Sequence, residues 1–324
     1  MISVVIPTFN RPEGLKAAVR SLFQQSYVEH GFRLIIVDNT PLATASDAIA
    51  DLARECPNNI TLLAFHEPAP GVANARNTAM ANVDTDLVAF LDDDQTAPPE
   101  WLENLLANYE QYPAAVTFGP VNTALPEGQR RHQAYFEQFF AREPDHASGY
   151  ISEAYGSGNA LVDFSQIHGG APWFDTDMNE IGGEDDLLFA RVRRSNGKFA
   201  WAAEAPVWEH PLPERVALRY TLRRAFAYGQ APITFARRGP RMRIDLIALW
   251  MLVGAGKTAF HGIQWLGLSL VRHPGRAFQL DRAVRGIAKL LWWIDFKFYG
   301  AAALKAKQAK PEPSSAPVDA VEPA

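Results

Sequence analysis

The sequence predicts an α/β fold in which helices cover both faces of a mostly parallel sheet, followed by a basic helical appendage. Short apolar runs alternate with amphipathic stretches over the first 120 residues, which is the pattern of repeated strand–helix units. With 324 residues, 48% of them hydrophobic, the chain can bury a large core, which excludes global disorder. Cys56 is the only cysteine, so disulfide scaffolds and thiolate-rich metal centres are excluded and a reducing compartment is expected.

Five strands and four helices are expected to alternate in the first 120 residues. Met1 leads straight into the first apolar run, so we expect no secretory signal peptide. Each strand is a continuous run rich in Val, Ile and Leu, typical of strands buried on both faces of a sheet. The expected strands are 3–7, 33–38, 60–65, 87–91 and 116–121, and the helices between them begin at Pro12 and cover 47–56, 71–83 and 98–111.

Between residues 122 and 210 the alternation fades, as expected where an open sheet acquires loops that build a substrate pocket. We predict a helix over 184–194 and a strand over 199–208, and helical periodicity returns over 211–240. The expected organisation is a main domain (1–210), a helical basic segment (211–300) and a disordered tail rich in Ala, Pro, Lys and Ser (301–324).

Charge is distributed unevenly along the chain, whose net charge is −5. Residues 1–210 contain 13 Lys and Arg against 29 Asp and Glu, whereas residues 211–300 contain 15 against 4. A basic segment attached to an acidic body indicates contact with a polyanion. We interpret this partner as an anionic membrane rather than nucleic acid, because the basic segment also carries tryptophans, which prefer the lipid headgroup layer. These are Trp250, Trp265, Trp292 and Trp293.

Residues 244–271 raise the question of how deeply the chain enters the membrane. The apolar run 246–256 has about half the length that a bilayer span requires, and Lys257 and His261 interrupt it before a second run at 266–271. A helix lying in the headgroup layer fits this pattern best. A hairpin packed on the main domain is the alternative, and a clean span fits least. Arginines flank the segment at positions 237, 238, 241, 243, 272 and 276.

Polar side chains gather where the predicted strands end. Asp92, Asp93 and Asp94 directly follow the fourth strand. Three adjacent carboxylates repel one another, and a divalent cation such as Mg²⁺ or Mn²⁺ relieves that cost. Arg11 and Arg76 lie on neighbouring edges and are suited to pair with a diphosphate. Because ligands bind open α/β sheets beyond the carboxyl ends of the strands, the sequence predicts a metal and diphosphate site there.

These motifs, taken in order, resemble the glycosyltransferases of family 2, which have the GT-A fold with a Rossmann-like, mostly parallel sheet. The resemblance covers residues 1–210. Residues 201–230 are similar more narrowly to the succinoglycan-type glucosyltransferases of bacterial exopolysaccharide assembly. The family motifs are carried by Val4–Pro12, Val37-Asp38, Gly71–Asn77, Phe90–Asp94, Ser157–Leu161 and Gly182–Leu187.

The resemblance implies which residues contact the nucleotide. Asp38 is expected to hydrogen-bond the uracil or ribose, Arg76 to lie near the base and diphosphate, and Asp92 to contact the ribose. The edge of the first strand is expected to border the nucleotide through Pro7, Thr8 and Arg11.

The resemblance also implies a metal ligand and a general base. Asp94 matches the metal ligand of the Asp-x-Asp signature. Asp93 is the variable middle residue of that signature and is expected to belong to the cofactor-binding residues. Asp185 matches the general base. His210 lies where some relatives place a residue near the metal or diphosphate, and a structural strand-end histidine is an equal alternative. The acceptor side is expected to be lined by Gly158 and Asn159.

The predicted reaction is the inverting, metal-dependent transfer of a single sugar from UDP-glucose or another UDP-hexose. A cation, Mn²⁺ or Mg²⁺, neutralises the departing diphosphate, and a carboxylate takes the proton of the attacking hydroxyl. The expected acceptor is lipid-linked or an oligosaccharide of cell-surface polysaccharide synthesis, at the cytoplasmic face of the inner membrane. Processive synthases carry a Gln-x-x-Arg-Trp motif that the stretch Leu222–Phe226 lacks, so one sugar per encounter is expected.

Two alternatives from other classes fit parts of the sequence. Asp92–Thr96 matches the Asp-x-Asp-x-Thr motif of haloacid-dehalogenase-like phosphatases, with Asp92 as nucleophile, although that motif usually ends a first strand. A non-catalytic adaptor that binds a sugar nucleotide or lipid is the other. Metal-dependent release of UDP separates the transferase from both. Gly254–Thr258 imitates a phosphate-binding loop, but Met251 stands where the motif requires glycine.

Overall fold

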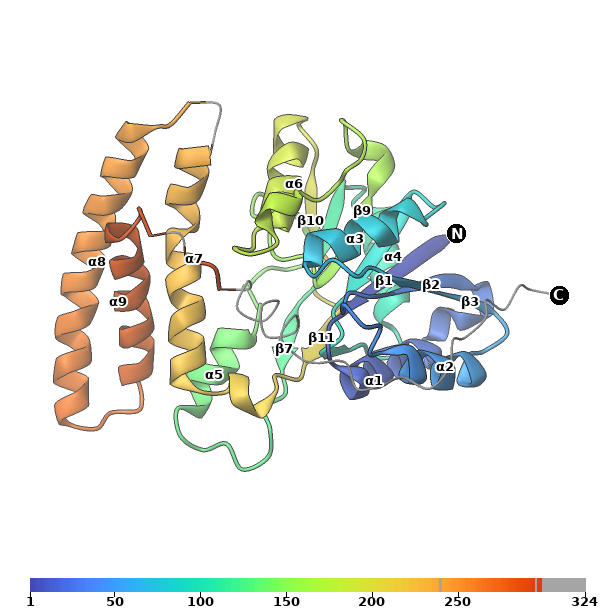
Figure 1. Ribbon diagram of the computed structural model, residues 1–324, viewed down its shortest axis with the longest axis horizontal. Coiled ribbons are helices and arrows are strands. Elements are labelled where there is room, and N and C mark those ends of the chain that lie inside the picture. Colours follow the sequence, from blue (N-terminus) through green and yellow to red (C-terminus); the bar gives the residue numbers. More distant parts are fainter. Residues whose placement is uncertain (239–240, 295, 299–324) are drawn as a thin grey trace.

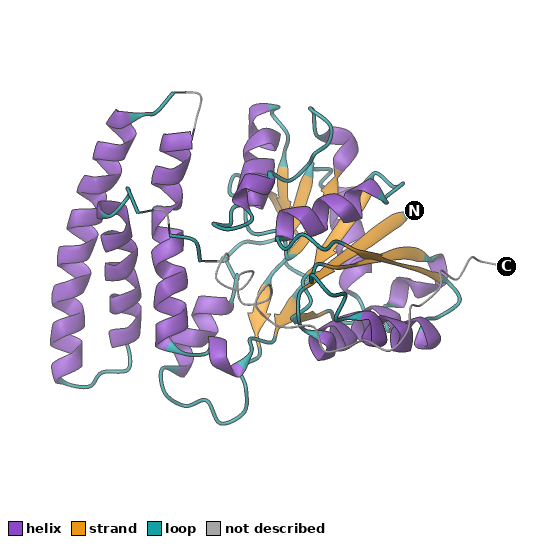
Figure 2. Ribbon diagram, viewed as in Figure 1, coloured by secondary structure: helices purple, strands orange, loops and turns teal. Residues whose placement is uncertain are grey.

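The computed structural model describes residues 1–238, 241–294 and 296–298, and Figure 1 shows its ribbon. The expected tail 301–324 lies outside the described residues. A central sheet carries helices on both faces (Figure 2), which confirms the α/β prediction. In spatial order its strands are β3 (Ile60–His66), β2 (Phe32–Asp38), β1 (Ile2–Thr8), β4 (Leu87–Leu91), β9 (Asn159–Asp163), β6 (Val116–Phe118), β10 (Phe199–Trp201) and β8 (Gly149–Ile151).

A second, smaller sheet and nine α-helices complete the described part of the chain. The small sheet has the order β5 (Gln95–Thr96), β11 (Val207–Glu209) and β7 (Val121–Thr123). The helices are α1 (Pro12–Phe23), α2 (Ser46–Glu55), α3 (Val72–Ala81), α4 (Trp101–Gln111), α5 (Gln133–Phe140), α6 (Glu184–Arg194), α7 (Leu218–Arg238), α8 (Ile244–Leu270) and α9 (Arg276–Leu290).

Strands β3, β2, β1 and β4 are parallel, so their carboxyl ends meet at one edge of the sheet. Strand β1 lies between β2 and β4, with Thr8 opposite Asp38. The run of apolar residues in β1 and β2 is almost fully buried, as a strand covered on both faces requires. This register brings the residues that follow β1 and β4 side by side.

Several elements differ from the prediction. Strand β9 runs antiparallel between β4 and β6, and the helix α5 was not expected. The expected strand 116–121 is divided at Gly119-Pro120, because proline lacks the N–H that a continuing ladder needs. The expected strand 199–208 is likewise divided into β10 and β11. These breaks let the chain leave the large sheet and build the small one.

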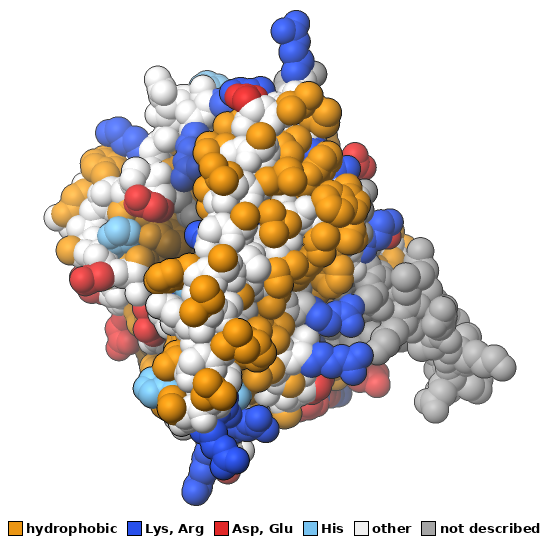
Figure 3. Space-filling view, turned by 90° about the vertical axis from the view of Figure 1, so that its left-hand side faces the viewer, with side chains coloured by type: hydrophobic (Ala, Val, Ile, Leu, Met, Phe, Trp, Pro, Cys, Tyr) orange, Lys and Arg blue, Asp and Glu red, His pale blue; other side chains and the backbone are white. Residues whose placement is uncertain are grey.

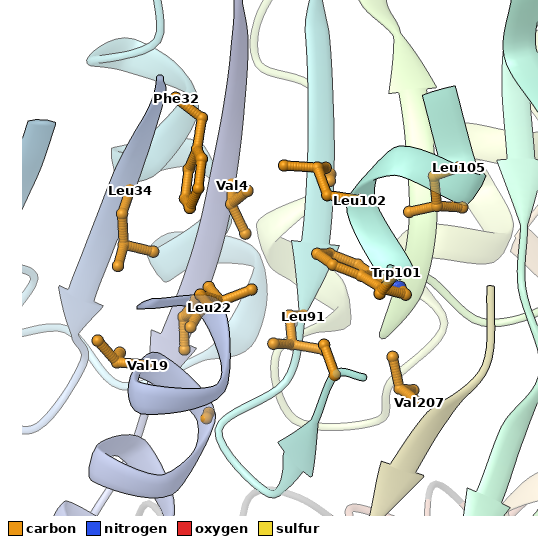
Figure 4. Close-up of a cluster of buried hydrophobic side chains, with 14 of the residues drawn as sticks. Val4, Val19, Leu22, Phe32, Leu34, Leu91, Trp101, Leu102, Leu105 and Val207 are labelled. Atoms are coloured by element: carbon orange, nitrogen blue, oxygen red, sulfur yellow. The ribbon is translucent and has the colours of Figure 1, made fainter. Parts of the chain in front are cut away.

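Buried apolar side chains fill the space between the large sheet and helices α1 and α4 (Figure 4). This core holds the strands whose carboxyl ends carry the candidate site residues. Leu22 of α1 and Leu102 of α4 are fully buried against strand residues such as Leu91. Each such side chain stabilises the fold by about 1.5–3 kcal/mol. Trp101 is 1% exposed, and its Nε1 donates a hydrogen bond of 2.9 Å to Asn159 Oδ1. The inner part of the molecule is therefore rigidly packed beneath the sheet edge.

Helices α7, α8 and α9 form a layer at one end of the molecule, with α8 outermost (Figure 1). They join the main body through α5. Tyr135 of α5 packs edge-to-face on Phe278 of α9, with 5.5 Å between ring centroids, and its hydroxyl donates to Asp281 Oδ1 at 3.2 Å. Phe139 of α5 stacks on Tyr228 of α7 at 6.5 Å. One face of α5 is thus committed to the helical layer.

Helix α8 has an inner face on α9 and a bare apolar outer face. Leu252, Phe260, Ile263 and Leu270 are 73%, 60%, 70% and 86% exposed. Figure 3 shows hydrophobic side chains running along this helix, with basic side chains beyond both of its ends. By length and composition alone, the 27-residue helix could cross a membrane. The inner face of α8 is therefore packed as the hairpin alternative predicts. Its outer face is exposed and apolar, as a helix lying in the headgroup layer requires.

Candidate active site

The carboxylates after β4 meet the residues after β1 at the carboxyl edge of the sheet. Asp93 is 6% exposed and accepts hydrogen bonds from Thr8 Oγ1 at 2.8 Å and from Phe9 N at 3.2 Å. Arg11 Nη1 lies 2.6 Å from Asp93 Oδ1 and 2.7 Å from Asp94 Oδ2. Burial raises the pKa of Asp93 to about 6, although Arg11 lowers it. Asp93 therefore connects the loop Asp92–Asp94, called the carboxylate loop below, to the end of β1.

Asp94 is held by two arginines. Besides Arg11, Arg215 Nη1 lies 3.4 Å from Asp94 Oδ2. No three His, Cys, Asp or Glu side chains of the described ranges stand together as a ready metal cage. Mg²⁺ is usually held by one or two carboxylates, with waters and substrate phosphates as its other ligands. The carboxylate oxygens of Asp94 and its neighbour Asp92 fit such a hard cation.

Arg76 links the carboxylate loop to the start of α6. It is 4% exposed, its Nη1 lies 2.5 Å from Glu184 Oε1, and its Nη2 lies 3.5 Å from Asp92 Oδ1. Its guanidinium also lies 5.6 Å from the ring centroid of Phe174. Such a buried, doubly paired cation fixes two segments relative to each other. A direct contact of Arg76 with a diphosphate remains a prediction.

Asp185 lies in the first turn of α6, as the sequence predicts. Its Oδ2 accepts hydrogen bonds from Ser157 N at 3.1 Å and from Ser157 Oγ at 3.2 Å. Its Oδ1 accepts from the backbone N–H of Asp186 at 2.9 Å, and a carboxylate here interacts favourably with the helix dipole. The side chain is half-exposed and held in one orientation, as a proton acceptor must be.

The segment Gly156–Gly158 passes between the two groups of carboxylates. A Cβ built on Gly158 would lie 2.2 Å from Asp92 Oδ2 and 3.2 Å from Arg142 Nη2. A Cβ built on Gly156 would lie 2.2 Å from Arg142 Nη1 and 3.6 Å from Asp185 Oδ2. Only glycine leaves room for this approach. The glycines thus bring the carboxylate loop, Arg142 and Asp185 to one place.

Glu184 supplies a pH-dependent contribution to stability. Burial and the neighbouring Asp185 raise the pKa of Glu184 from 4.5 to about 7, although Arg76 lowers it. The folded chain then binds this proton more tightly than the unfolded chain, so the free energy of unfolding falls as the pH rises from 4.5 to 7.

We expect Glu184→Gln to reduce the slope of the unfolding free energy against pH by up to about 1.4 kcal/mol per pH unit, the contribution of one proton. Thermal unfolding of both proteins across that range measures the difference. The Tm of the wild type should fall more steeply with pH than that of the variant. Parallel curves would show that the Glu184 carboxyl does not carry the effect.

His210 lies beside the carboxylate loop, where its backbone N–H and its ring already have partners. Its backbone N–H donates to Asp94 O at 2.7 Å, and its Nε2 lies 2.9 Å from Thr96 Oγ1. Burial lowers the pKa of this imidazole, so the neutral form that binds metals is favoured. These partners agree with a structural role for His210, and a contact between His210 and a metal stays a prediction.

Two other expected site residues have their polar atoms occupied. Asp38 is 2% exposed, and its carboxylate accepts hydrogen bonds from Thr40 N, Thr40 Oγ1 and Ala45 N at 2.7–2.9 Å. It shapes the loop after β2, and its nucleotide contact remains a prediction. Asn159 is 1% exposed, and its amide bonds Trp101, Pro120 and Ala205 inside the core. The expectation that Asn159 lines the acceptor side is wrong. Pro7 is half-buried at the end of β1.

Three site residues were not singled out from the sequence. Arg215 pairs with Asp94, and Arg142 lies against the glycine segment. Glu209 has a pKa raised to about 7 by burial and by Asp94, although Arg224 and Arg142 lower it. Glu209 and Arg215 lie in the stretch 201–230 that resembles succinoglycan-type glucosyltransferases, which was the available signal for them. Arg142 belongs to none of the motifs named above.

Comparison with known proteins identifies the family. The family description "Glycosyl transferase family 2" matches residues 3–169. The chain belongs to this family. Succinoglycan biosynthesis protein ExoM of Rhizobium meliloti (strain 1021) is 33% identical over 235 residues, which cover 71% of this chain and 73% of that protein. The recognition from sequence motifs is thereby confirmed, and the phosphatase and adaptor alternatives are set aside in favour of a sugar-transferring enzyme.

Further relatives and a solved structure agree with this assignment. Pre-mycofactocin glycosyltransferase of Mycobacterium tuberculosis (strain CDC 1551 / Oshkosh) is 29% identical over 92% of this chain and 59% of its own length. Mannosyltransferase PcManGT from Pyrobaculum calidifontis, solved with GDP-Man and Mn²⁺, superimposes with a TM-score of 0.60 at 17% identity. It covers 91% of this chain and 88% of its own, which confirms the GT-A-like fold.

Proposed function

We propose that the chain catalyses the inverting, metal-dependent transfer of one sugar from a UDP-hexose, UDP-glucose in particular, to a lipid-linked or oligosaccharide acceptor of cell-surface polysaccharide synthesis. One observation carries the proposal: the carboxylate loop and Asp185 converge around Gly156–Gly158 from two separate elements. One element can hold the departing diphosphate while the other faces an attacking hydroxyl. The preference for UDP-glucose rests on the resemblance of residues 201–230 to the succinoglycan-type glucosyltransferases.

On the donor side, Asp94 would hold a divalent cation together with the diphosphate, and Asp92 would contact the ribose of the nucleotide. The cation supplies Lewis-acid neutralisation of the negative charge on the departing nucleotide. Arg11 and Arg215 lie beside these carboxylates and would donate hydrogen bonds to the phosphates. Arg76 holds Asp92 relative to Glu184 at the start of α6.

On the acceptor side, Asp185 would accept the proton of the attacking hydroxyl. Ser157 holds the carboxylate through two hydrogen bonds, so one oxygen is oriented before the acceptor arrives. A single base and a single displacement invert the anomeric carbon without a glycosyl-enzyme intermediate. Metal-dependent release of UDP is the first test, in a screen of purified protein against a panel of sugar nucleotides with Mn²⁺ or Mg²⁺. If no sugar nucleotide in the panel releases UDP with either metal, the proposal is contradicted.

The outer face of α8 supports docking on the cytoplasmic face of an anionic inner membrane. The exposed apolar side chains of α8 can enter the interface between headgroups and acyl chains. Arg243 before the helix and Arg272 after it are exposed, and a basic residue near an anionic surface contributes on the order of 1 kcal/mol. Docking would hold the enzyme where a lipid-linked acceptor is presented.

We expect the double variant Leu252→Asp/Ile263→Asp to lose flotation with anionic vesicles, because both side chains are at least 70% exposed on α8 and charges oppose insertion. Leu42→Asp, at a position 53% exposed on the main body, is the matched control and should float like the wild type. Neutral vesicles should bind the wild type more weakly. Flotation that ignores both lipid charge and the α8 substitutions would show that this face does not meet lipid.

A further inference from the structure

We propose that a cavity beside the acceptor side of the site binds a saccharide ring, so that the acceptor already carries a sugar. This inference rests on the proposed function. The cavity has a volume of about 650 Å³ and lies between α5, the small sheet and the segment after α5. Its lining includes Asn122, Glu137, Gln138, Arg142, Tyr155 and Trp208. None of these residues lies in the six family motifs named above, and only Trp208 lies in the stretch 201–230 of the narrower resemblance.

One wall of the cavity is the face of α5 that the helical layer leaves free. Ala134, Glu137, Gln138 and Ala141 line the cavity, and their spacing places them on one face of the helix. Tyr135 and Phe139, on the other side, pack on α9 and α7. The two alanines leave room, while the carboxylate of Glu137 and the amide of Gln138 offer hydrogen-bonding groups for sugar hydroxyls.

Trp208 supplies an apolar plate in the lining of the cavity. It lies on β11 directly beside Asn122 of β7, so the two side chains point to the same face of the small sheet. Trp208 is 43% exposed, which is unusual for so large an apolar ring. An indole plate beside amide and carboxylate groups is suited to a sugar, which has an apolar ring face and a polar rim.

Arg142 both lines the cavity and lies close to the carboxylates of the site. Its guanidinium lies against Gly156 and Gly158, next to Asp185 and Asp92. Within the described residues its guanidinium makes no hydrogen bond and no ion pair within 4.0 Å, while its charge opposes the raised pKa of Asp92 and of Glu209. It is therefore free to donate to a hydroxyl or ring oxygen of a bound sugar, with a neighbouring hydroxyl directed toward Asp185.

The balance of charge argues for a sugar rather than a bare lipid phosphate. Glu137 and Glu143 line the same cavity as the single cation Arg142. Two carboxylates would repel a phosphate monoester, whereas they accept hydrogen bonds from sugar hydroxyls. The cavity thus assigns the enzyme to a step that extends an existing saccharide, and a reaction that places the first sugar on the lipid must precede it.

The test is a binding measurement on the full chain labelled with 5-fluorotryptophan. The ¹⁹F resonance of Trp208 is the one absent from Trp208→Phe. It is followed while methyl glycosides of glucose, galactose, glucuronic acid and N-acetylglucosamine, or inorganic phosphate, are added in the presence of UDP and Mg²⁺. We expect a saturable shift with at least one glycoside and none with phosphate. Arg142→Ala should raise the Kd of that glycoside about tenfold, and Tyr150→Ala, an exposed aromatic outside the cavity, should leave it unchanged.

A resonance that responds to no glycoside, or that responds to phosphate, would overturn the inference. UDP titration of each variant shows whether its donor side is folded. The outcome is separable from the proposed function, because nucleotide release from a sugar nucleotide is measured without any glycoside. Nucleotide release without glycoside binding would refute the cavity alone, and glycoside binding without nucleotide release from any donor would refute the transferase.

Discussion

Asp94→Ala is expected to abolish metal-dependent transfer, lowering kcat/KM by about a thousandfold. The substitution removes the carboxylate that would bind the cation on the departing diphosphate. The fold should survive, because Arg11 keeps its contact of 2.6 Å with Asp93 and one repelling charge disappears from the loop. Initial rates of UDP release at saturating Mn²⁺ measure the loss, and circular dichroism checks the fold.

Glu110→Ala is the control for Asp94→Ala, since it removes an exposed carboxylate from α4, far from the carboxylate loop in sequence. It should retain the wild-type rate. Wild-type activity that persists in excess EDTA, or an Asp94→Ala enzyme that turns over normally, would remove the metal from the mechanism.

Asp185→Asn is expected to retain donor binding and to lose transfer by a factor of about 10²–10⁴. The amide preserves the shape of the side chain but cannot take the proton of the attacking hydroxyl. UDP titration should give an unchanged Kd, so the loss should appear in kcat. Asp186→Asn is a matched control, because Asp186 lies in the same helical turn but is exposed. Equal transfer rates for Asp185→Asn and the wild type would require another base.

The sequence predicted that Arg11 and the carboxylates after β4 lie together, because their meeting follows directly from strand order. Parallel strands place their carboxyl ends at one edge, so the residues after β1 and β4 had to meet. Asp185 could be placed through the helix that begins at Glu184. The family motifs and the local chemistry pointed to the same residues.

The acceptor half could not be predicted in the same way. Strand β9 runs antiparallel and brings Gly158 back to Asp92, and no periodicity in the sequence fixes that direction. Arg142 and Trp208 come together only through the small sheet and α5, whose short elements depend on tertiary packing. Asp38 and Asn159 matched motifs, yet local backbone donors and buried carbonyls occupy their polar atoms. A sequence motif therefore identifies which residue stands at a position, but the hydrogen-bond partners of that residue in the fold determine its role.

The stereochemistry of the released sugar tests the central claim most directly. In the absence of acceptor, slow hydrolysis of UDP-α-glucose, or of the best donor in the screen, should use water in place of the acceptor hydroxyl. Proton NMR at early times, before mutarotation, reports the anomer that forms first. A single displacement assisted by Asp185 predicts the β-anomer, with the rate reduced in Asp185→Asn. Initial release of the α-anomer would contradict the account, because it requires two displacements or a different mechanism.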